Sequence, residues 1–280
     1  MADIQKLNDI ASQVRRDIIR QTFMCQSGHP GGSLGCADLL VALYFDVMEH
    51  STNFKMEGRG EDLFFLSNGH ISPVWYSVLA RAGYFSAGEL ATFRRINSRL
   101  QGHPTTHEGL PGIRVASGSL GQGISVAIGA ALSKKLNGDD HTVFCLTGDG
   151  ELEEGQVWEA AMFAPHNQVN NLVVICDRNN AQIDGTTEEV IGLGDVAAKW
   201  KTFGWEVMTM DGNDMHEVIV TLRAAKERSG RGKPIFILMH TAMGKGVDFM
   251  EGDYHWHGKA PNAEQAERAL AQLKETLGDY

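Results

Sequence analysis

The sequence predicts an α/β fold in which a doubly wound parallel sheet is flanked by helices. Short apolar runs of strand length alternate with segments whose apolar residues recur at helical spacing, and this alternation is typical of parallel sheets. The 280 residues are 42% hydrophobic, which is enough for a substantial core. No internal repeat or interdomain linker interrupts them. We therefore expect a single domain over residues 1–280.

The N-terminal half is expected to place helices around one strand. Apolar residues over 4–23 recur with helical period, so a first helix should lead into the loop 27–32, which is too glycine-rich to stay helical. Residues 37–47 predict a second buried helix, and residues 63–66 predict a strand. The polar stretch 94–116 contains two prolines. We expect it to form an irregular excursion over the mouth of a site, where binding residues collect.

The C-terminal half should supply the rest of the sheet. A helix is expected over 118–136, and its first N–H groups are free to meet a phosphate. The next elements are expected in the order strand 143–147, helix 154–164, strand 172–177, strand 205–210, helix 214–228 and strand 234–240. Residues 244–262 form a long irregular stretch, which we interpret as an active-site loop. A C-terminal helix is expected over 263–280.

Composition excludes several classes of protein. Thirty-five acidic and 25 basic residues give a net charge of −10, which argues against nonspecific binding to nucleic acid or to an anionic membrane. The four cysteines show no Cys-x-x-Cys spacing, and this pattern predicts a reduced, cytoplasmic protein. No apolar run approaches the length that crosses a bilayer, and the N-terminus lacks a secretory pattern. We expect neither nucleic acid nor membrane as a partner.

Two of the predicted strands end in oxygen ligands for a metal. Asp149 lies between Gly148 and Gly150 after one strand, and Asn179 follows the next strand along the chain. The carboxyl ends of parallel strands face one crevice, so these side chains should meet there. A carboxylate and an amide oxygen suit Mg²⁺ that also keeps phosphate oxygens and water. The glycines let an anionic group approach the backbone N–H donors, so the sequence predicts a diphosphate cofactor.

Gly148–Gly150, followed about thirty residues later by Asn179, resembles the signature of thiamine diphosphate enzymes. The resemblance implies that Asp149, Asn179 and the backbone carbonyl of Ala181 bind Mg²⁺, with Ca²⁺ or Mn²⁺ as substitutes. Within that superfamily the chain is most similar to transketolase. The matching segments, in transketolase order and at similar spacing, are Ser27–Gly31, Leu66–His70, Gly102–Pro104, Gly118–Gly123, Gly148–Gly155 and His257–Gly258.

Four histidines lie beside glycine or in loops at positions that match transketolase. The resemblance implies that His70 and His257 contact the cofactor diphosphate. It also implies that His29, His103 and, in part, His257 contact sugar hydroxyls and assist proton transfer. Imidazole titrates near neutrality, which suits both roles. His255 lies two positions before His257 and is the alternative ligand if the alignment slips by two residues.

For three further positions the resemblance implies a functional role, but an ordinary structural role would also explain the residue. Gly118 and Leu120 match positions that lend backbone groups and an apolar wall to the cofactor, although they also suit the start of a packed helix. Glu154 matches a glutamate that lies at the dimer contact of transketolases and links the two cofactors through a proton path. Its simpler role is to favour the positive end of the next helix. Related synthases of deoxyxylulose phosphate usually lack the Glu-Gly pair at 154–155, so transketolase ranks above them.

The matches cover only the first domain of a transketolase. The later domain, which holds the aminopyrimidine ring and supplies its activating glutamate, has no counterpart here, and three such domains need roughly twice this length. The resemblance therefore implies the N-terminal subunit of a split transketolase, with a C-terminal section as partner in a heterotetramer of two of each. The initial Met and the absence of a tag favour a naturally split gene product. The partner is expected to supply most of the cationic groups for substrate phosphate.

The reaction implied by the resemblance is transfer of a two-carbon ketol unit from a ketose, usually a phosphate ester, to an aldose, with thiamine diphosphate as electron sink. Two alternatives stay open. One is a subunit of another thiamine enzyme, such as the first component of an oxo-acid dehydrogenase or a deoxyxylulose-phosphate synthase. The other is a noncatalytic cofactor-binding module. Asn180, where transketolases commonly carry glycine, departs from the family pattern and leaves the sugar undetermined.

Overall fold

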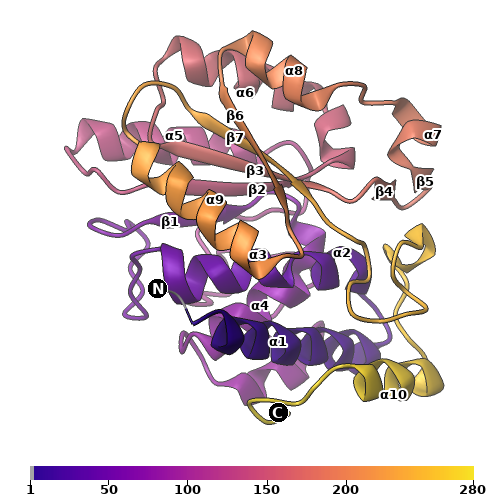
Figure 1. Cartoon of the computed structure of the whole chain (residues 1–280). Coiled ribbons are helices and arrows are strands. Elements are labelled where there is room, and N and C mark those ends of the chain that lie inside the picture. Colours follow the sequence, from indigo (N-terminus) through magenta and orange to yellow (C-terminus); the bar gives the residue numbers. More distant parts are fainter. Residues whose placement is uncertain (1–2) are drawn as a thin grey trace.

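The computed structural model describes residues 3–280 and shows a twisted parallel sheet between two layers of helices (Figure 1). The doubly wound α/β fold expected from the sequence is confirmed. The five strands pair in the order β1-β2-β3-β7-β6, and every pair is parallel. Their bounds are β1 Leu63–Leu66, β2 Val143–Gly148, β3 Leu172–Arg178, β6 Glu206–Asp211 and β7 Ile235–His240. Residues 1 and 2 of the expected domain lie outside the described residues.

Helices cover both faces of the sheet (Figure 1). One face packs against α1 Ile4–Cys25, α2 Pro30–Gly35, α3 Ala37–Ala42, α4 Ser72–Arg81 and α9 Met215–Arg228. The other packs against α5 Gly123–Leu136, α6 Gly155–His166 and α8 Val196–Phe203. A two-stranded hairpin with a short helix extends from the sheet edge and comprises β4 Ala181–Gln182, β5 Gly185–Thr186 and α7 Thr187–Ile191.

Strands β1, β2, β3 and β7 are buried on both faces over nearly their whole length, which explains their unbroken apolar runs. The edge strand β6 is only partly buried. Successive side chains of a strand point to opposite faces, so each strand contributes to two cores. In β2, Phe144 and Leu146 pack in the core shared with α1 and α9, whereas Val143 and Cys145 pack in the core shared with α5 and α6. The polar residues that follow each strand are therefore held at one edge of a rigid sheet.

Most expected boundaries hold within a few residues, but three expectations were wrong. The helix expected from 118 begins at Gly123, because Gly121 has a φ of +78°, which a right-handed helix cannot accommodate. Gly31 and Gly32 are helical in α2, which Pro30 opens with its fixed φ. The C-terminal helix α10 spans Ala263–Gln272 only. The apolar pattern also did not indicate α4, α7 or α8.

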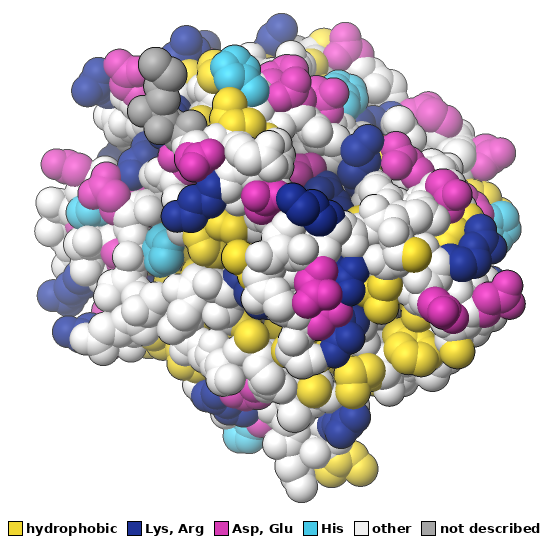
Figure 2. Space-filling model, turned by 60° about the horizontal axis from the view of Figure 1, so that its bottom comes forward, with side chains coloured by type: hydrophobic (Ala, Val, Ile, Leu, Met, Phe, Trp, Pro, Cys, Tyr) yellow, Lys and Arg dark blue, Asp and Glu magenta, His cyan; other side chains and the backbone are white. Residues whose placement is uncertain are grey.

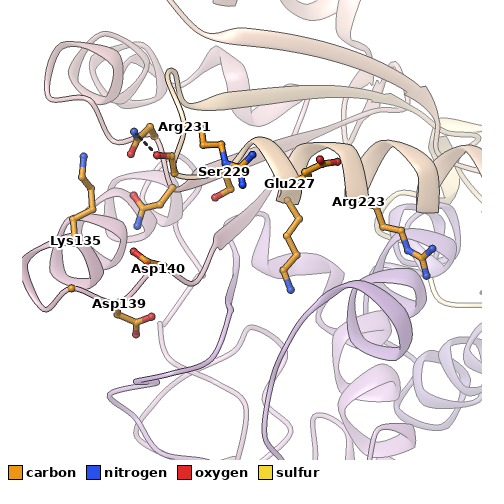
Figure 3. Close-up of a pocket in the computed structure, with 12 residues that line it drawn as sticks. Lys135, Asp139, Asp140, Arg223, Glu227, Ser229 and Arg231 are labelled. Atoms are coloured by element: carbon orange, nitrogen blue, oxygen red, sulfur yellow. Dashed lines mark hydrogen bonds between the residues drawn. The ribbon is translucent and has the colours of Figure 1, made fainter.

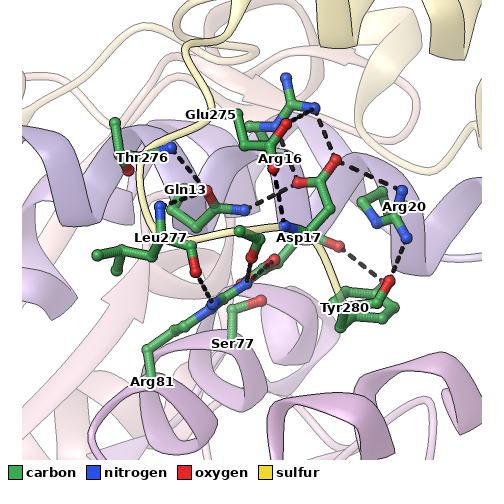
Figure 4. A network of polar contacts seen from close by, with 12 residues as sticks. Gln13, Arg16, Asp17, Arg20, Ser77, Arg81, Glu275, Thr276, Leu277 and Tyr280 are labelled. Carbon is green, nitrogen blue, oxygen red and sulfur yellow. Dashed lines mark hydrogen bonds and ion pairs between the residues drawn. The ribbon is translucent and has the colours of Figure 1, made fainter.

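Residues 273–280 form a C-terminal strap that runs back along α1 (Figure 4). Arg16 binds Asp279 through Nε and Nη2 at 2.9 and 2.7 Å. Gln13 Oε1 accepts the backbone N–H groups of Thr276 and Leu277, each at 3.0 Å. The strap therefore anchors α10, and with it the end of the loop 244–262, to the N-terminal helix.

The surface mixes acidic and basic side chains. On the face that carries α1 and α10, the two kinds of charge are interspersed (Figure 2). Lysines and arginines on this face therefore form no continuous basic patch. Within residues 3–280, no helix combines the length and apolarity needed to span a bilayer.

A buried ion pair between α1 and α4 offers a test of the packing. The Asp17 carboxylate is fully buried, and Arg81 donates to it from Nε and Nη2 at 2.8 and 2.7 Å (Figure 4). We expect Arg81→Met to lower the free energy of unfolding by about 3–5 kcal/mol, because it leaves a buried carboxylate uncompensated. Urea unfolding monitored by circular dichroism measures this loss.

The matched control is Arg99→Met. Arg99 also binds its carboxylate, that of Glu89, through two nitrogens, but the two side chains are 40% and 24% exposed. Water already solvates both groups there, so the expected loss is at most about 1 kcal/mol. Equal losses in the two variants would contradict the assignment of Arg81 and Asp17 as the stronger pair.

Candidate functional site

A cavity of about 250 Å³ lies at the carboxyl ends of β1, β2 and β3, beneath the loops that follow them. Its walls come from segments far apart in the sequence. The structure brings into these walls all but one of the expected site residues, namely His29, His70, His103, Gly118, Leu120, Gly148, Asp149, Gly150, Asn179, Ala181 and His257. The exception is Glu154, which is exposed at the N-terminus of α6.

A larger cavity of about 800 Å³ lies at the opposite edge of the sheet, near the starts of β2 and β3 (Figure 3). Two of its cations are already neutralised. Arg223 pairs with Asp46 at 2.7 Å, and Lys226 pairs with Glu49 and Asp62, each at 2.8 Å. Ligands of open α/β sheets collect at the carboxyl ends of strands. The smaller cavity is therefore the candidate site.

Asp149 and Asn179 meet because β2 and β3 are neighbours in the sheet. Asp149 Oδ2 accepts the backbone N–H of Asn180 at 2.7 Å. Asn179 Nδ2 donates to Asp177 Oδ2 at 2.7 Å, and Asn179 Oδ1 accepts the N–H of Ala181 at 3.0 Å. The amide oxygen of Asn179 thus faces the turn that contains Ala181, whose carbonyl is the third expected ligand.

The charge around Asp149 favours a cation. Burial, and then the nearby Asp177 carboxylate, raise the pKa of Asp149 to about 7. Arg178 opposes this effect, because it donates to Asp149 at 3.2 Å, but it also pairs with Glu188 at 2.9 Å. A buried carboxylate beside a second carboxylate gains stability when a cation binds.

The donor set matches a magnesium site that is only partly built by protein. Among residues 3–280, no group of three or more His, Cys, Asp and Glu side chains is arranged to hold a metal. A cation at Asp149 would therefore take further oxygens from Asn179, from the Ala181 carbonyl, from a phosphate and from water. Mg²⁺ commonly binds in this way.

Asp177 is a site residue that the sequence motifs did not reveal. It is buried at the end of β3, accepts the Thr241 hydroxyl at 2.5 Å, and holds Asn179 through its amide nitrogen. Burial raises the pKa of its carboxyl. The sequence did offer one signal for Asp177, since it is an acidic residue at the end of an apolar run. Only the structure shows that the neighbouring strand β7 encloses its side chain.

Four imidazole rings converge in the cavity from four separate segments. The ring centroid of His29 lies 5.1 Å from that of His70, 6.3 Å from that of His103 and 5.7 Å from that of His257. His70 and His257 are 5.0 Å apart. The His255 side chain is 66% exposed and bonds to a neighbouring aspartate. The structure thus places His257, and not His255, in the cavity.

Burial keeps these imidazoles neutral. Desolvation, followed by the charges of neighbouring residues, lowers the pKa of His29 to about 4 and the pKa of His70 well below its ordinary value. Burial also lowers the pKa of His257, and burial followed by the charge of Arg94 lowers the pKa of His103. A neutral imidazole has one donor and one acceptor nitrogen, so the rings suit hydrogen bonding to phosphate or hydroxyl oxygens.

Unsatisfied polar atoms indicate that the cavity is built for a polar ligand. Nδ1 of His29, Nδ1 of His257 and Oδ1 of Asn68 are buried without a hydrogen-bond partner among the described residues, a rare condition in folded proteins. A side chain at Gly118 or Gly148 would meet its nearest neighbours only at 3.8 or 3.7 Å. Packing does not require these glycines, so the missing side chains leave room for a ligand. These features fit a diphosphate cofactor.

Glu151 is buried in the cavity wall, although its sequence context favours a position at the start of a helix. The run of acidic residues that contains it favours the positive end of the next helix, but Glu151 is only 2% exposed and belongs to the cavity wall. Its carboxylate accepts the Gly121 N–H at 2.8 Å, the Gly148 N–H at 3.1 Å and the Ser67 hydroxyl. Glu151 therefore braces three segments that form the cavity wall.

Asn180 explains one departure from the transketolase pattern. Its φ is +60°, a left-handed conformation that asparagine tolerates better than most residues with a side chain. Glycine, the common residue there in the resembled family, adopts it freely. The substitution therefore keeps the turn that joins Asn179 to Ala181.

Comparison with known proteins is consistent with this geometry. The family described as transketolase, thiamine diphosphate binding domain, matches residues 7–279. An apulose-4-phosphate transketolase subunit of Phocaeicola vulgatus is 39% identical over 263 residues, which cover 94% of this chain and 92% of that protein. The 6-deoxy-6-sulfo-D-fructose transketolase subunit SqwG of Clostridium sp. is 37% identical over 267 residues, with 94% of each chain covered.

Solved structures of transketolases share this fold. The transketolase of Campylobacter jejuni has a TM-score of 0.89 and 31% identity, and the match covers 97% of this chain but 43% of that one. The transketolase of Leishmania mexicana has a TM-score of 0.88 and 30% identity, with 100% and 42% covered. The chain thus spans less than half of these transketolases, but nearly all of the two subunits named above.

These matches define the chain as a thiamine diphosphate-binding domain. Within that class it belongs to the transketolase family, and it corresponds to the N-terminal, cofactor-binding part of a transketolase. The recognition of this family from the sequence motifs is confirmed. The chain is one subunit of a transferase.

The neutral imidazoles give a prediction for pH dependence. The unfolded chain takes up a proton on His29 near its ordinary pKa of 6.5, whereas the folded chain does so only near a pKa of about 4. Between these values the unfolded state binds more protons, so the free energy of unfolding falls as the pH is lowered through this range. His29 contributes roughly 3 kcal/mol to this fall.

Two measurements check this prediction. An NMR titration should show the His29 ring neutral at pH 5, and urea unfolding at pH 7 and pH 5 should show a smaller pH effect in His29→Gln than in the unsubstituted chain. Protonation of His29 above pH 6 in the folded state would show that the ring is solvated, contrary to its buried position.

Proposed function

We propose that this chain is the N-terminal subunit of a split transketolase, which transfers a two-carbon ketol unit from a ketose to an aldose with thiamine diphosphate and Mg²⁺. The observation that carries the proposal is the convergence of Asp149, Asn179 and four neutral imidazoles in one cavity at the strand ends. The relatives are named for apulose-4-phosphate and 6-deoxy-6-sulfo-D-fructose. Both names denote sugars with an anionic group, which supports sugar phosphates or their analogues as substrates.

The metal and the cofactor diphosphate are assigned to one wall of the cavity. Asp149, Asn179 and the carbonyl of Ala181 would hold Mg²⁺, and His70 would donate to the diphosphate together with backbone groups of the glycines around Asp149. When bound, thiamine diphosphate supplies the electron sink for breaking the carbon–carbon bond of the ketose. This chain then serves to orient the reacting groups and to exclude water from them.

His29 and His103 are assigned to the substrate. The buried Nδ1 of His29 has no partner among residues 3–280, so it is free to bond a sugar hydroxyl. Because the pKa of His29 is lowered to about 4, the ring acts at neutral pH as a neutral hydrogen-bonding group. It can pass a proton between its nitrogens and a hydroxyl without carrying a permanent charge.

The partner section completes the proposed enzyme. The similar proteins of matching length are each named as one subunit of a transketolase, which supports a second polypeptide, and we propose a heterotetramer of two of each. The partner would hold the aminopyrimidine and supply its activating glutamate, while Glu154, exposed beside the site, would lie at a contact between chains. All four cysteines are free, which supports a reducing, cytoplasmic location.

The purified chain, given thiamine diphosphate and Mg²⁺ but no second polypeptide, is expected to show no ketol transfer. The reason is that the activating glutamate belongs to the missing section. Donor consumption in a coupled assay measures this, and coexpression with a C-terminal section should restore turnover. Robust turnover by a homogeneous preparation of this chain alone would refute the proposal of a split enzyme.

Asp149→Ala is expected to weaken Mg²⁺-dependent retention of thiamine diphosphate in the assembled complex by at least about ten-fold, because it removes the only carboxylate assigned to the metal. Equilibrium dialysis with and without Mg²⁺ measures retention. Asp140→Ala is the matched control, since Asp140 is exposed at the opposite edge of the sheet. Unchanged retention in Asp149→Ala would count against the metal assignment.

A further inference from the structure

A groove of about 650 Å³ opens beside the cofactor cavity, and His103 lines both. We refer to it as the Arg94 groove. Its walls also carry hydroxyl, amide and carboxylate groups, from Ser27, Gln101, Thr105 and Glu108. Such groups pair well with sugar hydroxyls. Because His103 is the shared wall, a sugar whose reacting end lies among the imidazoles can extend past His103 into this groove.

The guanidinium of Arg94 has no acidic partner within residues 3–280. Nη1 donates to the Ser27 hydroxyl at 2.8 Å, and Nε is buried without an acceptor. By contrast, Arg15, Arg16 and Arg81 each pair with an aspartate at 2.6 to 2.7 Å. A guanidinium offers five N–H donors in a planar fork. Most of those of Arg94 are unused, which indicates an anionic group that comes from outside the chain.

The backbone at Arg94 is strained in the conformation that places its side chain in the groove. Its φ is +57°, a left-handed conformation that is strained for a residue with a long side chain. Its N–H donates to the Leu100 carbonyl at 2.9 Å. Gly102 provides the space for the guanidinium, because a side chain at Gly102 would begin 2.7 Å from Arg94 Cζ and Nε. The local structure is therefore arranged around this side chain.

We propose that Arg94 binds the anionic end of the substrate sugar, a tetrahedral phosphate or sulfonate group. This inference rests on the proposed function, since it assumes that the sugar reacts in the cofactor cavity, among the four imidazoles. Glu108, in the same groove, pairs with no cation among the described residues. Its carboxylate repels an anion and accepts hydrogen bonds from sugar hydroxyls, so the anionic group lies at the Arg94 end. This chain thereby adds its own cation to those expected from the partner.

The first test uses the chain alone and needs no turnover. Inorganic phosphate is titrated into ¹⁵N-labelled protein, and the Nε–H signal of Arg94, assigned by its absence in Arg94→Lys, is followed by NMR. We expect a saturable shift of this signal and none of comparable size at the exposed neighbour Arg95. A parallel titration with methanesulfonate distinguishes a phosphate site from a sulfonate site. An Arg94 signal that neither anion shifts would overturn the proposal.

The second test uses the assembled enzyme with a ketose phosphate and the same ketose without phosphate. In Arg94→Gln, the KM for the phosphorylated sugar is expected to rise about ten-fold or more, because a charge-assisted hydrogen bond is lost. The KM for the unphosphorylated sugar and both kcat values should stay within about two-fold. Arg94→Lys should recover part of the loss, since it restores the charge without the planar fork.

Arg95→Gln is the matched control and should leave all four constants within about two-fold, since Arg95 does not line the groove. If Arg94→Gln impairs both sugars equally, Arg94 acts only by positioning His103, and the proposal is wrong. An unsubstituted complex that turns over no sugar contradicts the proposed function instead. In that case the anion titration still decides whether Arg94 binds phosphate or sulfonate.

Discussion

The parallel pairing of β2 with β3 is the constraint on which the site depends. It sets Gly148 beside Asp177, and the N–H of Asp149 continues the ladder by donating to the Asp177 carbonyl at 3.1 Å. Two carboxylates and the Asn179 amide are thereby held at one sheet edge, largely out of water. A shift of one residue in this register would turn alternate side chains to the opposite face. The arrangement of oxygens that we propose as a cation site therefore depends on this alignment.

The groups that the cavity offers to an anionic ligand are mostly uncharged. In a chain with a net charge of −10, an overall positive surface is not available to attract a diphosphate. Buried neutral imidazoles, backbone N–H groups and the cation proposed at Asp149 can do so locally, because hydrogen bonds and charges act more strongly where water is excluded. Arg94 is the exception, since its guanidinium is a permanent charge and lies in the adjoining groove.

The loops over the sheet edge depend on contacts that are distant in the sequence. Gly69, beside His70, approaches the Ser117 carbonyl so closely that a side chain there would begin 1.9 Å from it. Gly31, in α2, is packed in the same way against Met243 and the Trp256 carbonyl, one residue before His257. The C-terminal strap then fixes the far end of the loop 244–262 on α1. Close packing of glycines thus positions the imidazoles.

The sequence by itself determined the five strands of the main sheet, the helices with clear apolar periodicity and the residues at the strand ends, because apolar periodicity and glycine-flanked polar residues are local features of the chain. Only the tertiary structure decided that His257 rather than His255 lines the cavity, that Glu151 braces three segments, and that Asp177 holds Asn179. Each of these depends on contacts between segments far apart in the chain or on which way a side chain turns from its loop. Sequence spacing does not encode those distances, and the packed sheet and loops set them.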